Sequence, residues 1–291
     1  MRYFKFLIFL IAIAFSHQST FGQTDTLFWF AVPFVTDEHV DPLEADLTIT
    51  ATDKVNPTHV TISQPHEPDF GPINLTIDPA VDPTHNIHFD EADIRKFSNG
   101  NYNQWENSAL RIEADREITA YYEMHRTDNN PDIFSLKGNN ALGTDFWVPF
   151  QERWPNQTNY DSAFSQICVV ATEDDTKINV NFKRPAEGYG TGDTPPIELD
   201  KGETYMFVPE HAADGYPRQQ PGDRLVGTHI TSNHPIAVTT GDDSVVKGTA
   251  YDYIGDQLVP VKNPDGDYTI GEEYIVMKGQ VNDSKGNEKV Y

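Results

Sequence analysis

The sequence predicts an all-β protein built from tandem antiparallel β-sandwich modules. Three observations predict this class: apolar and polar residues alternate in many short runs, turn-forming residues separate those runs, and several segments recur 118 positions further along the chain. Alternation with a period of two is typical of strands that bury one face. A unit of this length can form a small domain with its own core, so the repeat indicates two such domains in series.

The alternating runs extend over most of the chain and include LTITATD, HVTIS, INLTID, LRIEA, EITAYY, KINVNF and PIAVTT. In KINVNF the pattern predicts that Ile178, Val180 and Phe182 face a core. Asn179 and Asn181 would then face water, as in an antiparallel sheet with one solvated face. The 20 prolines and 19 glycines lie mostly between such runs, which suits a loop-rich sandwich and argues against long helices.

The internal repeat is visible in three places. The matching pairs are Phe28-Trp29 with Phe146-Trp147, Val60-Thr61-Ile62 with Ile178-Asn179-Val180, and Ile112 and Ile118 with Ile230 and Ile236. They predict a first β module at residues 23–139 and a second at residues 140–291, within which a third repeat starts near residue 268. A β-propeller is the architectural alternative, but one blade has only about 40 to 50 residues.

The first 22 residues have the pattern of a secretory signal peptide. A basic start with Arg2 and Lys5 precedes an apolar run from Phe6 to Phe15, and small residues precede a cleavage point after Gly22. An uncleaved anchor is the alternative, but no stop-transfer pattern follows and the run is short for a bilayer. We therefore expect a secreted or cell-surface protein that is not inserted in a membrane after cleavage.

The charge limits the classes of partner, and the cysteine content shows what can hold the fold together. The formal net charge is -24, and removal of a leader with two basic and no acidic residues makes it more acidic. This charge disfavours nucleic acid and anionic membranes as partners. Cys168 is the single cysteine, so no internal disulfide can form and hydrophobic burial must hold the fold together. Within SQICVVA, Cys168 itself is expected to be a buried apolar residue.

One short helix is expected at residues 89–97, FDEADIRKF. Asp90 is available as its N-cap, and Arg95 and Lys96 lie near its end, where cations are favourable. The segment is too short to form a layer of the fold, so this helix does not change the predicted class.

Six segments, in their order along the chain, resemble the N-terminal domain of IgGFc-binding protein. The segments are ALGTDFWVPFQ (141–151), CVVATEDDTKINV (168–180), LDKGETYMF (199–207), LVGTHITSNHPIAVTTGDDSV (225–245), YDYIGDQLVPV (251–261) and EEYIVMKG (272–279). The resemblance covers residue 141 to the end well, and residues 26–140 more weakly through the internal duplication. The order of the six segments along the chain is more specific for this family than any single segment.

The resemblance implies an extracellular, non-catalytic surface or adhesion module. Such domains occur in a secreted animal mucus protein and in exported proteins of Bacteroidetes-type bacteria, whose signal peptides resemble the FGQ-ending leader seen here. Two departures are that this chain lacks a cysteine pair and that its 291 residues contain no C-terminal sorting domain. Antibody binding belongs to one animal member of the family, so it is not carried over to this chain.

Four aromatic residues are the candidate ligand contacts. Trp105 in NYNQWENS and Trp154 in QERWPNQTNY lie in polar, Asn-rich loops, and Tyr102 and Tyr160 lie close to them in sequence. Aromatic residues on loops are common anchors for ligands on β scaffolds. Trp29 and Trp147, in contrast, recur at one repeat position within apolar strands, and we expect both to lie in the core.

No catalytic residue and no metal ligand is predicted. The sequence has no G-x-S-x-G elbow, and the pair His85 and His88 matches no common zinc pattern. Carboxylate clusters at residues 37–41, 173–175, 242–243 and 265–273 leave calcium as an unassigned alternative. The turn at residues 173–175 and the equivalent turn at Asp53 also favour aspartate for their geometry alone.

The sequence therefore favours a non-catalytic extracellular binding or adhesion module that recognises a glycoprotein or a glycan. One alternative is a passive structural spacer of a longer surface protein. A second alternative is a carbohydrate-active or peptide-cleaving enzyme with carboxylates in a loop cleft. It is less favoured, because a pair of carboxylates can always be found among 45 acidic residues and is therefore no evidence for catalysis.

Overall fold

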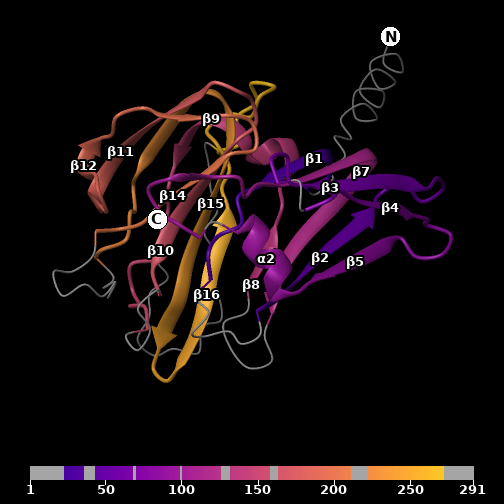
Figure 1. Ribbon diagram of the computed structural model, residues 1–291, viewed down its shortest axis with the longest axis horizontal. Helices are drawn as coiled ribbons and strands as arrows, with labels where there is room; N and C mark the ends of the chain where they lie inside the picture. Colours follow the sequence, from indigo (N-terminus) through magenta and orange to yellow (C-terminus); the bar gives the residue numbers. More distant parts are fainter. Residues whose placement is uncertain are drawn as a thin grey trace, which may run out of the picture.

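The computed structural model describes residues 23–35, 43–67, 70–98, 100–125, 132–157, 163–210 and 222–271. These residues form two curled antiparallel sheets, so the all-β prediction is confirmed (Figure 1). The predicted signal peptide at residues 1–22 and the stretch at residues 272–291 lie outside the described residues. No helix in the described part of the chain is long and apolar enough to cross a membrane.

The first sheet contains seven strands. They are β1 (Asp25–Phe30), β2 (Glu44–Ala51), β3 (Thr58–Ser63), β4 (Ile73–Ile77), β5 (Thr84–Phe89), β7 (Leu110–His125) and β8 (Asp132–Ser135). Their main path is β4-β3-β7-β2-β5, and β1 and β8 both pair with the long strand β7. Burial alternates along β2, where Leu47 and Ile49 enter the core and Thr48 does not, as the period of two predicts.

The second sheet contains nine strands. They are β6 (Trp105–Glu106), β9 (Leu142–Trp147), β10 (Ser165–Ala171), β11 (Thr176–Ala186), β12 (Gly190–Asp193), β13 (Ile197–Leu199), β14 (Thr204–Phe207), β15 (His229–Lys247) and β16 (Ala250–Gln257). Their path is β12-β11-β15-β10-β14-β6, and β9 and β16 pair with β15. In β11 the alternation KINVNF behaves as predicted: Ile178, Val180 and Phe182 are buried, whereas Asn179 is exposed and Asn181 is partly exposed.

The two sheets share one pairing scheme. Phe28 of β1 pairs with Ile112 of β7, and Phe146 of β9 pairs with Ile230 of β15, each residue 118 positions after its counterpart. The pairs Val60–Ala114 and Ile178–Ser232 repeat this relation between β3 and β7 and between β11 and β15. Strands β8 and β16 flank the far halves of β7 and β15 in the same way. The strands that the two sheets have in common are therefore arranged in the same order and paired in the same register.

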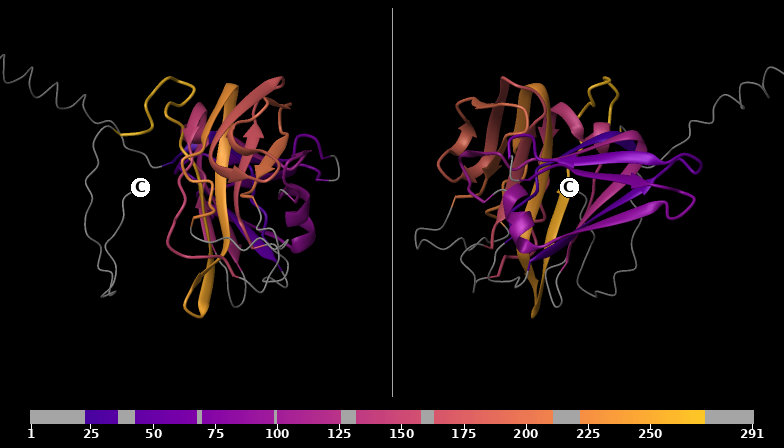
Figure 2. Two further views of the ribbon diagram at one scale, coloured as in Figure 1. Left: turned by 90° about the vertical axis from the view of Figure 1, so that its left-hand side faces the viewer. Right: turned by 45° about the vertical axis from the view of Figure 1, so that its right-hand side comes forward.

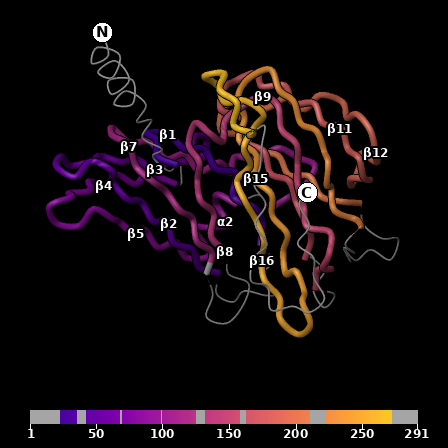
Figure 3. The backbone as a smooth tube through the Cα atoms, turned by 180° about the vertical axis from the view of Figure 1, so that it is seen from behind, coloured from indigo at the N-terminus to yellow at the C-terminus, as the bar shows by residue number. Residues whose placement is uncertain are grey.

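The boundary between the predicted modules, at residues 139 and 140, stays a prediction. The sheets do not divide the chain cleanly there, because β6 lies early in the sequence and pairs with β14 of the second sheet. Tyr253 of β16 also joins the apolar core of the first sheet. Figures 2 and 3 show the long β15–β16 hairpin beside the first sheet, with β8 next to β16.

A third apolar cluster joins the sheets. Trp29 and Ala31 from the β1 segment pack there with Cys168 and Val170 of β10 and Met206 of β14. Cys168 is buried and free, as expected. At the other end of the first sheet, helix α2 (Glu91–Phe97) confirms the predicted helix, and the Asp90 side chain accepts a hydrogen bond from the Asp93 amide.

Candidate functional site

The candidate site is the outer face of the second sheet where β9 meets β15. Strand β9 alternates, so Phe146 enters the core and its neighbour Trp147 points outward. Cross-strand pairing places His229 directly opposite Trp147. The two rings stack face to face, with their centroids 4.2 Å apart and their planes 10° from parallel. His229 Nε2 lies 2.8 Å from Asp145 Oδ1, and this hydrogen bond fixes the imidazole under the indole. We call this trio the Trp147 platform.

The prediction that Trp147 lies in the core is wrong. Trp147 is 51% exposed, whereas its repeat counterpart Trp29 is 2% exposed. Trp29 is buried because the second sheet covers it, and the guanidinium of Arg111 lies 5.5 Å from its ring centroid. His229 occupies on the second sheet the position that Arg111 has on the first. The two tryptophans thus occupy equivalent positions in the repeat, but one is buried and the other is exposed.

Polar side chains continue the exposed face beyond the platform. Asn181 of β11 pairs with His229, and its amide donates a 2.7 Å hydrogen bond to Asp193 of β12. The Lys183 ammonium donates to Asn181 Oδ1 at 2.5 Å. A flat aromatic surface with polar groups of both signs at its border has the arrangement of a binding face, in which an apolar anchor is surrounded by a polar rim.

A groove of about 250 Å³ lies two residues beyond Trp147. Its lining residues are Pro149, Phe150, Gln151, Thr240, Asp242, Ile254, Gly255 and Asp256. Pro149 is exposed and Ile254 is 46% exposed, so the rim of the groove is apolar and accessible. Thr240 and Asp242 continue the alternation of Ile236 and Val238, which lie in the inner core, so the groove opens on the face of the second sheet opposite to Trp147.

A buried polar network supports the groove from below. Arg224 Nε donates to Asp242 Oδ2 at 2.6 Å, and both residues are almost fully buried. Asn156 Nδ2 donates to Asp242 Oδ1 at 2.8 Å, and Gln151 Nε2 donates to Asp242 Oδ2 at 3.1 Å. Burial raises the pKa of Asp242, and the Arg224 charge opposes this shift. The network ties the 149–156 segment to β15, so the groove wall is held in place.

The loop aromatics predicted as ligand contacts lie in separate places. Trp105 is 59% exposed on β6, and Tyr102 packs edge-on against Phe164 with ring centroids 6.5 Å apart. Trp154 is partly buried between two cations, with Arg153 4.6 Å and Lys247 5.6 Å from its ring centroid. Tyr160 lies outside the described residues.

Strand register shows how far apart the two loop tryptophans are. Trp105 is in register with Tyr205, Val169 and Val238 across the second sheet. The segment that carries Trp154 meets β15 near Val246, eight positions further along that strand. At about 3.3 Å per residue, this places Trp154 roughly 25 Å along the strand direction from Trp105. They cannot contact one small ligand together, and whether either contacts a ligand stays a prediction.

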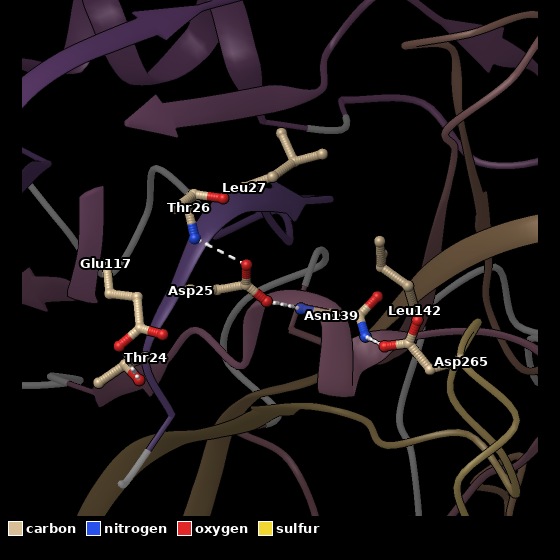
Figure 4. A pocket seen from close by; sticks show the side chains of 8 residues that line it. All are labelled: Thr24, Asp25, Thr26, Leu27, Glu117, Asn139, Leu142 and Asp265. Atoms are coloured by element: carbon tan, nitrogen blue, oxygen red, sulfur yellow. Dashed lines mark hydrogen bonds between the residues drawn. The ribbon is translucent and has the colours of Figure 1, made fainter. Parts of the chain in front are cut away.

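A hollow at the start of β1, about 460 Å³ in volume, has three carboxylates in its lining (Figure 4). Asp25 accepts hydrogen bonds from the amides of Thr26, at 2.7 Å, and Asn139, at 2.6 Å. Asp265 accepts from the Asn139 side chain at 2.6 Å, and Glu117 accepts from the Thr24 hydroxyl at 3.4 Å. These bonds tie the start of β1 to the connector between the sheets, which gives the carboxylates a structural role.

The acidic clusters considered for calcium form turns and ion pairs where they are described. Asp53 accepts hydrogen bonds from Val55 and Asn56, as its turn requires, and Asp242 pairs with Arg224. Asp174 accepts from the Lys201 amide at 3.1 Å. Among the described residues, no three His, Cys, Asp or Glu side chains converge to hold a metal ion. The cluster at residues 37–41 lies outside the described residues.

Sequence reasoning missed the platform, although its signal was present. The repeat pairs Trp147 with Trp29 and His229 with Arg111, and alternation places each tryptophan on the face opposite its neighbouring phenylalanine. What the pattern does not give is which of the two tryptophans the other sheet covers. The burial of Trp29 comes from residues about 140 to 180 positions away in the sequence, such as Cys168 and Met206.

Two duplicated antiparallel sheets, the second carrying an exposed indole stacked on an anchored imidazole, define an all-β protein of sandwich architecture with an aromatic surface open to solvent. The chain is a member of the IgGFc-binding protein family, whose model matches residues 134–291, more than half of the chain. This match confirms the resemblance seen in the sequence, and the family is one of binding domains. No curated protein and no solved structure matches the chain.

Proposed function

We propose that this protein is a non-catalytic binding module, exported to the cell surface or the medium, that recognises an extracellular glycoprotein through the Trp147 platform. The observation that carries the proposal is the exposed indole of Trp147, held rigid by its stack on His229. Tryptophan side chains in rigid, partly enclosed positions are the residues that most often dominate binding energy at protein surfaces. The leader-like residues 1–22 support export.

The composition of the platform fits a reversible interface. A large exposed apolar surface at the centre, with Asp145 and Asn181 at its edge, allows a partner to bury the ring while water keeps access to the rim. The Trp147 side chain loses little conformational entropy on binding, because its stack on His229 already fixes its orientation. The net charge of -24 further favours partners that are not strongly acidic.

Binding of residues 23–291 to a panel of immobilised glycoproteins and glycans, with mucin and immunoglobulin included and with and without calcium, tests the proposal. Trp147→Ala should weaken the binding tenfold or more, because it removes the anchor of the interface. Trp105→Ala is the matched control, since Trp105 is similarly exposed on the same sheet but lies on β6.

Two results would contradict the proposal. If Trp105→Ala or Trp154→Ala abolishes binding while Trp147→Ala does not, the ligand surface lies on the loops. If the intact protein binds nothing in the panel, the passive spacer becomes the better account, and the close packing of the two sheets through Trp29 and Tyr253 already suits a rigid spacer.

A further inference from the structure

Strand β4 forms one edge of the first sheet (Figure 1). It pairs with β3 along its whole length, and no strand in the described part of the chain pairs with its other side. An open edge presents backbone N–H and C=O groups that can pair with a further strand, so proteins usually protect it with charged side chains, proline or a bulge. Strand β4, with the sequence INLTI, has no charge, no proline and no register shift.

The second sheet protects the equivalent edge. Pairing with β3 and with β11 aligns INLTI, residues 73–77, with PPIEL, residues 195–199, which end in β13. The two prolines have no N–H to donate to an added strand. Glu198 adds an exposed charge, and its carboxylate lies 3.0 Å from the Lys177 ammonium. The same edge is therefore protected in the second sheet and open in the first.

The sequence of β4 is complementary to itself when two copies run antiparallel. Leu75 then lies opposite Leu75 of the second copy, Ile73 lies opposite Ile77, and Asn74 lies opposite Thr76. The inner face thus pairs apolar side chains, and the outer face pairs an amide with a hydroxyl. A shift of one residue would turn apolar side chains toward water, so the pattern selects this register.

From the open edge and its self-complementary sequence, we infer that two copies of this protein pair through β4 across a two-fold axis. The two first sheets then form one continuous antiparallel sheet, in which the edge groups of both β4 strands gain hydrogen-bond partners. Ile73 and Leu75, which are only partly buried against the first core, become covered. No charged side chain lies within the paired strands, so the net charge of -24 opposes the contact only from a distance.

The dimer is independent of the Trp147 platform, which lies on the second sheet. A contact of five residues from each copy is small, so the dimer is expected to form and separate readily. Each dimer carries two platforms. Two linked platforms bind a surface with many copies of one ligand more tightly than a single platform does.

Sedimentation velocity of residues 23–291 at rising protein concentration tests the inference. The protein should shift from monomer to dimer without larger species, because a two-fold contact closes on itself. Thr76→Glu should raise the dissociation constant tenfold or more, since it gives the open edge the charge that Glu198 gives to the second sheet. Asn179→Glu is the matched control, because Asn179 is exposed on β11, which has strands on both sides. Circular dichroism of both variants checks that the fold is kept.

A cysteine at position 75 tests the register. The two-fold axis brings both copies of Leu75→Cys directly opposite each other, where Cβ atoms lie about 4.5 to 5.5 Å apart and a disulfide can form on mild oxidation. The native Cys168 is buried and does not interfere. Val81→Cys is the control, since Val81 is 85% exposed in a turn and the two-fold axis places its two copies far apart.

Three outcomes would overturn the inference. A protein that remains a monomer at the highest soluble concentration has no such contact. A dimer that Thr76→Glu leaves as strong as the parent forms through another surface. Disulfide formation by Leu75→Cys that is no faster than that by Val81→Cys contradicts the two-fold register.

Discussion

At the scale of the residue, Trp29 and Trp147 show what a local pattern can determine. Both follow a buried phenylalanine in a strand, so both point to the outer face of their sheet. Their exposures of 2% and 51% differ because the second sheet covers Trp29, whereas no described strand covers Trp147. Alternation predicts the direction of a side chain, but the cover comes from contacts that are distant in sequence, which a single sequence does not reveal.

Asp132 provides a test of residue-level electrostatics at the contact between the sheets. Burial raises the pKa of this carboxyl to about 6 from its ordinary value of 3.8, and the backbone hydrogen bonds from Ile133 and Gly255 only partly oppose the shift. Between about pH 4 and pH 6 the folded protein keeps a proton that the unfolded chain has lost. The free energy of unfolding should therefore fall as the pH rises through this window.

In Asp132→Asn this pH-dependent loss should disappear, since the amide has no charge to gain. Urea unfolding of the variant and the parent should show the stability difference shifting in favour of the variant from about pH 4 to pH 6 and then levelling off. Asp53→Asn is the control, because hydrogen bonds from Asn56 and Val55 lower the pKa of Asp53 to about 2. A difference between Asp132→Asn and the parent that is constant across the window would refute the assignment.

At the scale of the element, the sequence predicts most strands and the helix α2 well. The alternating runs that became β2, β3, β7 and β11 and the capped segment that became α2 carry their own signals of period and capping. Strand β6 does not, because two residues, Trp105 and Glu106, are too few for a pattern and are ordered by pairing with β14. The register shifts between β1 and β7 and between β9 and β15 are likewise a property of the pairing and not of either strand alone.

Helix α2 provides the test at this scale. The Asp90 carboxylate accepts the Asp93 amide hydrogen at 3.0 Å, and the helix buries Ile94 and Phe97 against the first sheet. Asp90→Ala should lower the free energy of unfolding by about 1 kcal/mol, because an amide at the helix start loses its partner. Asp90→Ser restores an N-cap acceptor and should recover most of the loss. Equal stability of Asp90→Ala and the parent in urea titration would show that the cap contributes nothing.

At the scale of the whole molecule, the two sheets are expected to unfold together. Gln257 of β16 donates to the Trp29 carbonyl at 2.7 Å and accepts from the Lys137 amide at 2.8 Å, and Tyr253 completes the first core. A duplicated sequence alone predicts two domains that fold independently of each other. Strand β16, which contacts both sheets, and the apolar cluster around Trp29 are instead expected to make the two sheets one cooperative unit.

Gly255→Ala tests this coupling. A Cβ at Gly255 would lie 2.4 Å from the Phe134 ring and 2.8 Å from the Thr240 carbonyl oxygen, so β8 and β16 would have to separate. We expect a cost of about 1 to 3 kcal/mol and a broader or split thermal transition in calorimetry. Gly71→Ala, where the added methyl group meets nothing within 4 Å, should leave a single transition. Two separate transitions in the parent protein would contradict the coupling.

The fold class, the repeat and the family were thus within reach of the sequence, whereas the candidate site was not. The sequence directed attention to the loop residues Trp105 and Trp154, which are conspicuous in polar surroundings. The structure instead directs it to Trp147, which has the sequence pattern of a core residue but is 51% exposed, opposite His229.

The most direct test of the central claim is oxidative footprinting of the four tryptophans by mass spectrometry, in the free protein and with a bound glycoprotein from the panel. The account predicts that in the free protein Trp147 and Trp105 react and Trp29 does not, in line with their exposures. With the partner bound, Trp147 should become protected while Trp105 keeps its reactivity. Protection of Trp105 or Trp154 with Trp147 unchanged would contradict the claim that the open face of the second sheet is the binding site.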